Sequence, residues 1–221
     1  MKNLEEIAEQ AHQSFEARTQ ARDKALLQAR QLTRHSANAI RAIHRSEQQE
    51  AEAQLKNAGA IVASLKSDLS SYPDLFYAGY TQDAIKEFAE ANITVALVRN
   101  EHLPSPEDLK VEYATYLNGL AEAAGELRRR CLDILRQGYS QEAERLLSCM
   151  DDIYGVLVTM DYPDAVTSGL RRQTDLVRGV TERTRGDLTL SIREEQLKQT
   201  MTALIDRLAS FEGNDATDSG V

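Results

Sequence analysis

The stretch YLNGLAEAAGELRRRCLDILRQGY (Tyr116–Tyr139) has the apolar periodicity of a long amphipathic helix. Its apolar stripe begins three residues earlier and comprises Tyr113, Leu117, Leu120, Ala124, Leu127, Cys131 and Ile134. Gly119 and Gly125 interrupt this helix, and each costs about 1 kcal/mol relative to Ala. We therefore expect another helix backbone to pass close to these two positions. Gly138 is a typical residue for the end of a helix.

The same periodicity divides the rest of the chain into long helices. Upstream, LPSPEDL (Leu103–Leu109) contains an N-cap serine followed by proline at the first helical position, so we expect this helix to cover 106–137. The other expected helices cover 3–45, 48–71, 81–100, 140–160 and 165–211. A bend in the last helix, if it has one, falls near Gly179 or Gly186. The helix over 81–100 has two apolar or small faces, which predicts burial on most sides.

The composition agrees with an all-α protein. Aromatic residues make up 5% of the 221 residues, Trp is absent, and there are only 4 Pro. We predict a single-domain bundle of six to seven helices over residues 1–211, followed by a polar disordered tail over 212–221.

The sequence gives no sign of export or of membrane insertion. The longest apolar run in a helix centre is Ile93–Val98, which is too short to span a bilayer. The start, MKNLEEIAEQ, lacks the apolar core of a signal peptide, and Cys131 and Cys149 form no C-x-x-C pair. We therefore expect a cytoplasmic protein with reduced thiols.

Two pairs of carboxylates stand out on the helices over 81–100 and 106–137. Glu87 and Glu90 are spaced i,i+3, and Glu122 and Glu126 are spaced i,i+4, so each pair shares a helix face among small or apolar neighbours. Oxygen ligands of this kind suit Mg²⁺ or Mn²⁺, which can activate water for displacement at phosphorus. The alternative is a solvated face, because Glu is common in helices and Glu126 has Arg129 three residues on.

A basic stripe contrasts with the net charge of −9. Residues 18–45 contain seven Arg or Lys and one acid, Asp23. Four of the arginines fall in a narrow sector of the helix, which predicts phosphate contacts: Arg30, Arg34, Arg41 and Arg45. The alternative is that the stripe pairs with acidic groups of its own chain.

Other kinds of site find little support. Phosphate-binding loops of the G-x-x-x-x-G-K-[ST] or G-x-G-x-x-G type are absent. The four histidines are not beside the Glu pairs in the sequence, and Glu-x-x-His is missing, which argues against a di-iron bundle. Few aromatic residues are available for base stacking, so we expect phosphate contacts and weak sequence preference.

Several segments resemble the translin and TRAX (translin-associated factor X) family. The stretch Tyr116–Tyr139 resembles the family's central helix, GYTQDAIKEFAEA (Gly79–Ala91) the helix before it, and AIRAIHR (Ala39–Arg45) the end of the first helix. GLRRQTDLVRGVTERTRGDLTLSIR (Gly169–Arg193) resembles the C-terminal helix, so the similarity covers about 40–195.

The resemblance implies a translin-like α-α superhelix and one of two activities. TRAX-type subunits are Mg²⁺-dependent ribonucleases with an E-x-x-E pair and a D-x-x-x-E pair. Translin-type subunits lack the full set and bind single-stranded RNA or DNA. Glu87, Glu90 and Glu126 match the catalytic pattern, whereas Glu122 stands where the family has Asp. The leading hypothesis is thus an endoribonuclease for single-stranded RNA with a four-Glu Mg²⁺ site, and the alternative is a non-catalytic nucleic-acid-binding scaffold.

The resemblance also implies a closed homo-octamer with RNA inside. The expected helix over 165–211 offers an apolar surface that such an interface would bury. Its members are Leu170, Val177, Val180, Leu188, Leu190, Ile192, Leu197, Met201, Leu204, Ile205 and Leu208. The alternative is that this surface packs on the chain's own core.

Overall fold

The structure is a computed structural model that describes residues 3–215, and within these residues every regular element is a helix. Six helices are long: α1 (Leu4–His44), α2 (Gln48–Asp68), α4 (Gly79–Val98), α6 (Tyr113–Leu135), α7 (Gln141–Leu157) and α9 (Leu170–Asp215). Three are single turns: α3 (Pro73–Phe76), α5 (Pro106–Leu109) and α8 (Asp164–Thr167). The all-α bundle expected from the sequence is therefore confirmed.

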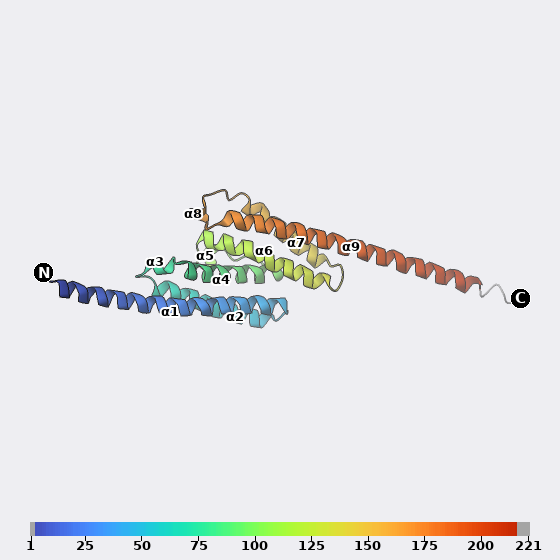
Figure 1. The fold of residues 1–221 in the computed structure, drawn as a ribbon. Helices are drawn as coiled ribbons and strands as arrows, with labels where there is room; N and C mark the ends of the chain where they lie inside the picture. The colour runs from blue at the N-terminus through green and yellow to red at the C-terminus, as the bar shows by residue number, and fades with distance from the viewer. Residues whose placement is uncertain (1–2, 216–221) are drawn as a thin grey trace.

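The long helices are stacked in layers (Figure 1). The pair α1 and α2 lies on one side, α4 and then α6 form the middle, and α7 and α9 lie on the other side. One core cluster fills the space between α1, α2 and α4, and another joins α6, α7 and α9 to α4. The mostly apolar or small residues of α4 explain its central place, because buried residues occur on most of its faces.

The contact between α4 and α6 is unusually close at Gly119. A Cβ placed on Gly119 would lie 3.0 Å from the Cβ of Ala89, the amide nitrogen of Glu90 and the carbonyl oxygen of Lys86. The expected close approach is thus found at Gly119. It is not found at Gly125, where a Cβ would meet nothing within 4 Å.

This difference gives a matched pair of variants. Gly119→Ala is expected to destabilise the protein by about 1–3 kcal/mol, because two of the three crowded neighbours are backbone atoms that cannot move aside. Gly125→Ala should stabilise it by about 1 kcal/mol through helix propensity alone. Urea denaturation of both variants measures the two free energies of unfolding. Equal effects of the two substitutions would contradict the close packing of α6 on α4.

The helix expected over 106–137 is divided into α5 and α6. Ser105 caps α5 as expected: its hydroxyl accepts from the Asp108 amide at 3.1 Å, and the Asp108 carboxylate accepts from the Ser105 amide at 2.9 Å. The helix nevertheless stops after one turn, since Lys110 is left-handed (φ 55°) and Glu112 is extended. Leu109 and Val111 pack against the core on either side of this break. Tertiary packing therefore overrides a continuous helical pattern.

The end of the chain also differs from the expectation. Ser168 and Gly169 have positive φ angles and separate α8 from α9, which then continues without a break to Asp215. The segment 212–221 was expected to be a disordered tail; its first four residues are helical, and 216–221 lie outside the described residues. None of the described helices meets the length and hydropathy needed to cross a membrane.

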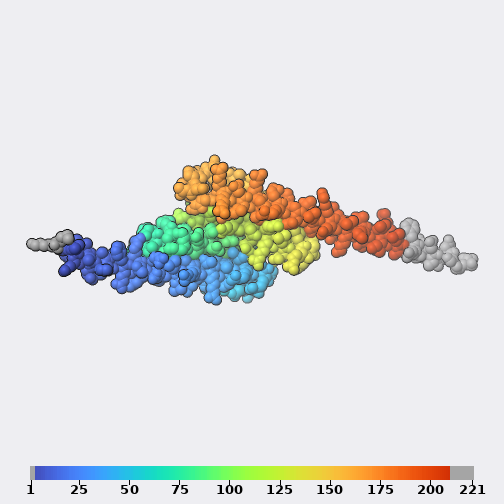
Figure 2. Space-filling view, in the orientation of Figure 1, coloured from blue at the N-terminus to red at the C-terminus, as the bar shows by residue number. Residues whose placement is uncertain are grey.

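Two helices project beyond the body of the bundle, in opposite directions (Figures 1 and 2). The first half of α1 extends from one end, and roughly the second half of α9, from about residue 190 onward, extends from the other. Leu170, Val177 and Leu188 are buried, so the first part of α9 packs on its own core. The projecting part instead exposes large apolar side chains, each 55–62% accessible: Leu190, Leu197, Met201, Leu204, Ile205 and Leu208.

Candidate functional site

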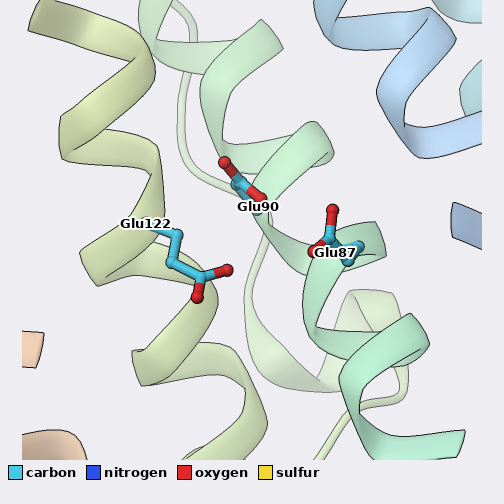
Figure 3. Close-up of side chains that lie close together, drawn as sticks. All are labelled: Glu87, Glu90 and Glu122. Atoms are coloured by element: carbon cyan, nitrogen blue, oxygen red, sulfur yellow. The ribbon is translucent and has the colours of Figure 1, made fainter. Parts of the chain in front are cut away.

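Three of the four carboxylates singled out in the sequence meet at the contact between α4 and α6. One oxygen atom each of Glu87, Glu90 and Glu122 lies within 4.8 Å of the others. Glu122 extends from α6 toward Glu87 and Glu90, which are on neighbouring turns of α4 (Figure 3). The crowding at Gly119 explains the meeting, because α6 packs directly against the backbone at Glu90. We call these three residues the carboxylate cluster.

The cluster concentrates negative charge in a partly dry place. The side chain of Glu90 is buried, and this burial together with the charges of Glu87, Glu122 and Glu126 raises its pKa to about 8. Burial and the charge of Glu122 also raise the pKa of Glu87. These raised pKa values mean that full ionisation of the cluster is unfavourable unless a cation binds to it.

Lys86 supplies part of the missing positive charge. Its Nζ donates to Oε1 of Glu122 at 2.7 Å, and the same oxygen accepts from Nε2 of Gln173 on α9 at 3.3 Å. Burial lowers the pKa of Lys86, but the hydrogen bond and charge of Glu122, together with the charges of Glu87 and Asp83, outweigh burial and leave that pKa raised. Lys86 is therefore a fixed positive charge at one edge of the cluster.

Glu126 stands apart from the cluster, although it is one turn beyond Glu122 on α6. Its Oε2 is 2.6 Å from Nε2 of His44 at the end of α1 and 3.6 Å from the guanidinium of Arg129. The hydrogen bond from His44 lowers the pKa of Glu126 despite partial burial. The described residues thus bring together three members of the expected four-residue set, and the fourth is held by a histidine.

His44 is the residue that sequence reasoning missed. No histidine is near the Glu pairs along the chain, so a histidine at the site was not expected. In the structure His44 contacts Glu126, although the two residues are 82 positions apart. The His44 side chain is 4% exposed, and Arg130 donates to its backbone carbonyl at 3.0 Å. The sequence signal that could have indicated burial of His44 was its position directly after the buried stripe of α1, which ends at Ile43.

Comparisons with known proteins identify the family. No protein-family model matches the chain. An uncharacterized protein of Methanocaldococcus jannaschii, MJ0175, is 32% identical over 180 residues, which span 80% of this chain and 79% of that protein. The crystal structure of AfC3PO is 34% identical, with a TM-score of 0.78 over 85% of this chain and 97% of that chain. The chain belongs to the translin/C3PO family.

Two further structures of the translin/C3PO family extend the comparison. AfC3PO in complex with duplex RNA is 35% identical to this chain, with a TM-score of 0.79 and the same coverage of 85% and 97%. Apo-NeC3PO is 19% identical and shares the fold, with a TM-score of 0.75 over 86% of this chain and 98% of that chain.

The basic stripe of this translin-family chain is exposed along α1. Arg45 is paired with Glu47 at 2.7 Å, and Arg41 donates to the side chain of Asn38 at 2.5 Å. Among the residues that the structure describes, Arg30 and Arg34 form no ion pair. Pairing of the basic stripe with acidic groups of its own chain is thus found at Arg45. Arg30 and Arg34 remain available to bind another molecule.

Proposed function

We propose that this protein is a Mg²⁺-dependent endoribonuclease that cleaves single-stranded RNA within a homo-oligomer. The observation that carries the proposal is the convergence of Glu87, Glu90 and Glu122 from two abutting helices, with oxygen atoms within 4.8 Å of one another. A solvated acidic surface does not bury a carboxylate such as Glu90, so the arrangement favours a site over a chance cluster.

The donor set fits a hard divalent cation. Three carboxylates offer only oxygen ligands, and Mg²⁺ or Mn²⁺ held by them would supply a Lewis acid for phosphodiester hydrolysis. Glu90 keeps a proton near neutral pH because its pKa is about 8, so cation binding should release this proton and strengthen as pH rises. Lys86 neutralises part of the charge on Glu122. The negative charge that remains in the cluster is smaller than the positive charge of two divalent cations.

Two observations support RNA as the substrate. AfC3PO, which is 35% identical, has been solved with duplex RNA. In this chain, Arg30 and Arg34 are exposed on α1, the helix that also provides His44 beside Glu126. A strand that contacts the basic stripe can therefore be guided along α1 toward the carboxylate cluster.

The direct test is incubation of a 5′-labelled single-stranded RNA with pure protein, first with Mg²⁺ and then with EDTA. We expect internal cleavage with Mg²⁺ and intact RNA with EDTA. A second candidate function is a non-catalytic scaffold for single-stranded RNA or DNA, and the observation in its favour is that Glu126 binds His44 rather than joining the cluster. Bound but uncut RNA in the presence of Mg²⁺ would select this scaffold function.

His44 is expected to position Glu126 for the reaction. His44→Ala removes the 2.6 Å contact, so Glu126 loses its fixed orientation, and Mg²⁺-dependent cleavage should fall about 10–100-fold. His35→Ala is the matched control, because His35 lies on the same helix but contacts Gln54. Rates measured at saturating RNA decide the point. Equal rates for both variants would remove His44 from the site.

The basic stripe should contribute RNA affinity without base preference. The double substitution Arg30→Ala and Arg34→Ala is expected to weaken binding of all sequences alike and to lower the salt slope by about 1.4, near 0.7 per lost contact with a single strand. The control replaces Arg18 and Arg22, which lie on the same helix and are engaged with Asp74 and Asp23. Fluorescence anisotropy at several salt concentrations measures both slopes. An unchanged slope in the first variant would assign the stripe to another role.

A further inference from the structure

A cavity of about 570 Å³ lies directly beside the carboxylate cluster. Lys86 and Gln173 are part of its wall, and both of them donate to Glu122. The cavity is therefore separated from the cluster by the side chains that bind Glu122. A molecule held in the cavity would be adjacent to any bond placed at the cluster.

Two tyrosines at the cavity are exposed. Tyr77 follows α3 and is 60% exposed, and Tyr113 begins α6 and is 66% exposed. The sequence suggested that few aromatic residues were available for stacking on bases. The structure places these two, 36 positions apart in the chain, on one cavity beside the cluster.

The free polar groups of the cavity are mainly hydrogen-bond acceptors. The side-chain carboxylates of Asp83 and Glu112 line it, and among residues 3–215 neither forms a hydrogen bond or an ion pair, although the charge of Asp83 acts on nearby Lys86. The nitrogen donors, by contrast, are each engaged once: Lys86 and Gln173 donate to Glu122, and the amide of Gln82 donates to the carbonyl of Phe76 at 3.0 Å. Two free carboxylates repel a phosphate group, so the cavity suits a neutral, flat ligand that offers N–H donors.

We propose that this cavity is a subsite for one unpaired nucleobase, and that it prefers bases with an amino group on the pairing edge, namely guanine, adenine and cytosine, over uracil. The proposal rests on RNA being the substrate, as argued above. Tyr77 and Tyr113 provide aromatic faces for the base, and Asp83 and Glu112 accept from its amino group. Uracil offers one ring N–H and two carbonyl oxygens, and those oxygens would face the carboxylates.

A subsite of this kind would also give the protein a preference for single strands. In a duplex the pairing edge of each base is occupied, and the base must leave its stack before it can enter a cavity. An unpaired nucleotide enters without that cost. The base in the cavity would then fix which neighbouring phosphodiester bond lies at the carboxylate cluster.

The test measures binding in EDTA, so that it does not depend on catalysis. The probes are fluorescent oligouridylates that are either uniform or carry one central guanosine, and fluorescence anisotropy on the full-length protein gives their affinities. The wild type should bind the guanosine probe about tenfold more tightly. The variant with Asp83→Ala and Glu112→Ala, which removes both acceptors, should lose this preference and should bind the uniform probe at least as tightly as the wild type.

A second variant tests the aromatic faces. Tyr77→Ala with Tyr113→Ala should weaken binding of the guanosine probe about tenfold, whereas Tyr162→Ala, an equally exposed tyrosine outside the cavity, should leave it unchanged. Light scattering on every variant checks the oligomer mass. Altered mass in the cavity variants would assign this surface to contact between copies and would overturn the proposal.

The remaining outcomes separate this proposal from the proposed function. Equal affinity of the wild type for both probes, with Mg²⁺-dependent cleavage intact, overturns only the base subsite. A guanosine preference that depends on Asp83 and Glu112, without any cleavage, upholds the subsite and overturns the nuclease. Absence of RNA binding overturns both.

Discussion

Glu90→Gln is expected to abolish Mg²⁺-dependent cleavage of RNA and, in EDTA, to stabilise the folded protein. Glutamine keeps the shape of the side chain but removes the most deeply buried ionisable group of the carboxylate cluster. Divalent-cation affinity falls because an anionic ligand is lost. The metal-free protein gains stability because a buried carboxylate with a pKa of about 8 is costly to ionise.

The pH dependence follows from the direction of this shift. A raised pKa means that the folded state binds the proton of Glu90 more tightly than the unfolded state, where the pKa is 4.5. The stabilising effect of this proton is complete below pH 4.5 and is lost as pH rises through 8. Since one pKa unit corresponds to about 1.4 kcal/mol, the loss amounts to a few kcal/mol. Glu90→Gln should remove this component of the pH dependence.

Thermal unfolding in EDTA at pH 5 and pH 8, with Mn²⁺ titration calorimetry and the cleavage assay, measures these effects together. The matched control is Glu182→Gln, which changes an exposed glutamate of α9. Full cleavage by Glu90→Gln would refute the site. A stability profile identical to that of the wild type would refute the burial of the ionised carboxylate.

Replacing Leu197, Leu204 and Leu208 with glutamine is expected to break the proposed homo-oligomer into smaller species. These side chains are spaced by seven and four residues, and with Met201 between them they form the 3–4 repeat of a helix that packs against another helix. They lie on the projecting part of α9 and are 56–61% exposed in the single chain. Burial of such a stripe between copies would remove the apolar surface from water.

Light scattering gives the mass of each species directly. The wild type should have a mass near eight times 24.7 kDa, as expected of a closed octamer, and the triple variant a mass at least twofold lower. Thr200→Gln with Thr202→Gln is the control, because these exposed residues are on the same part of α9. A wild-type mass of 24.7 kDa would contradict the closed assembly.

The periodic features of the sequence predicted most of the fold. The six long helices follow from apolar stripes, and the close contact at Gly119 follows from a glycine amid good helix formers. The meeting of Glu87, Glu90 and Glu122 agrees with two sequence predictions, namely a carboxylate pair on each of two helices and a close helix contact beside one of these pairs.

The features that sequence reasoning missed depend on contacts between distant segments. The helix breaks at Lys110 because Leu109 and Val111 reach the core, which local propensity does not encode. His44 meets Glu126 only after α1 and α6 have both packed against α4. The same holds for Tyr77 and Tyr113, which become neighbours of one cavity through the fold.

The central claim is that Glu87, Glu90 and Glu122 hold a divalent cation. Crystals grown with Mn²⁺ and measured at the manganese absorption edge test it most directly. We expect an anomalous peak between α4 and α6, within bonding distance of all three carboxylates and absent from crystals of Glu90→Gln. Saturating Mn²⁺ without a peak at these carboxylates, in crystals of protein that cleaves RNA, would contradict the account.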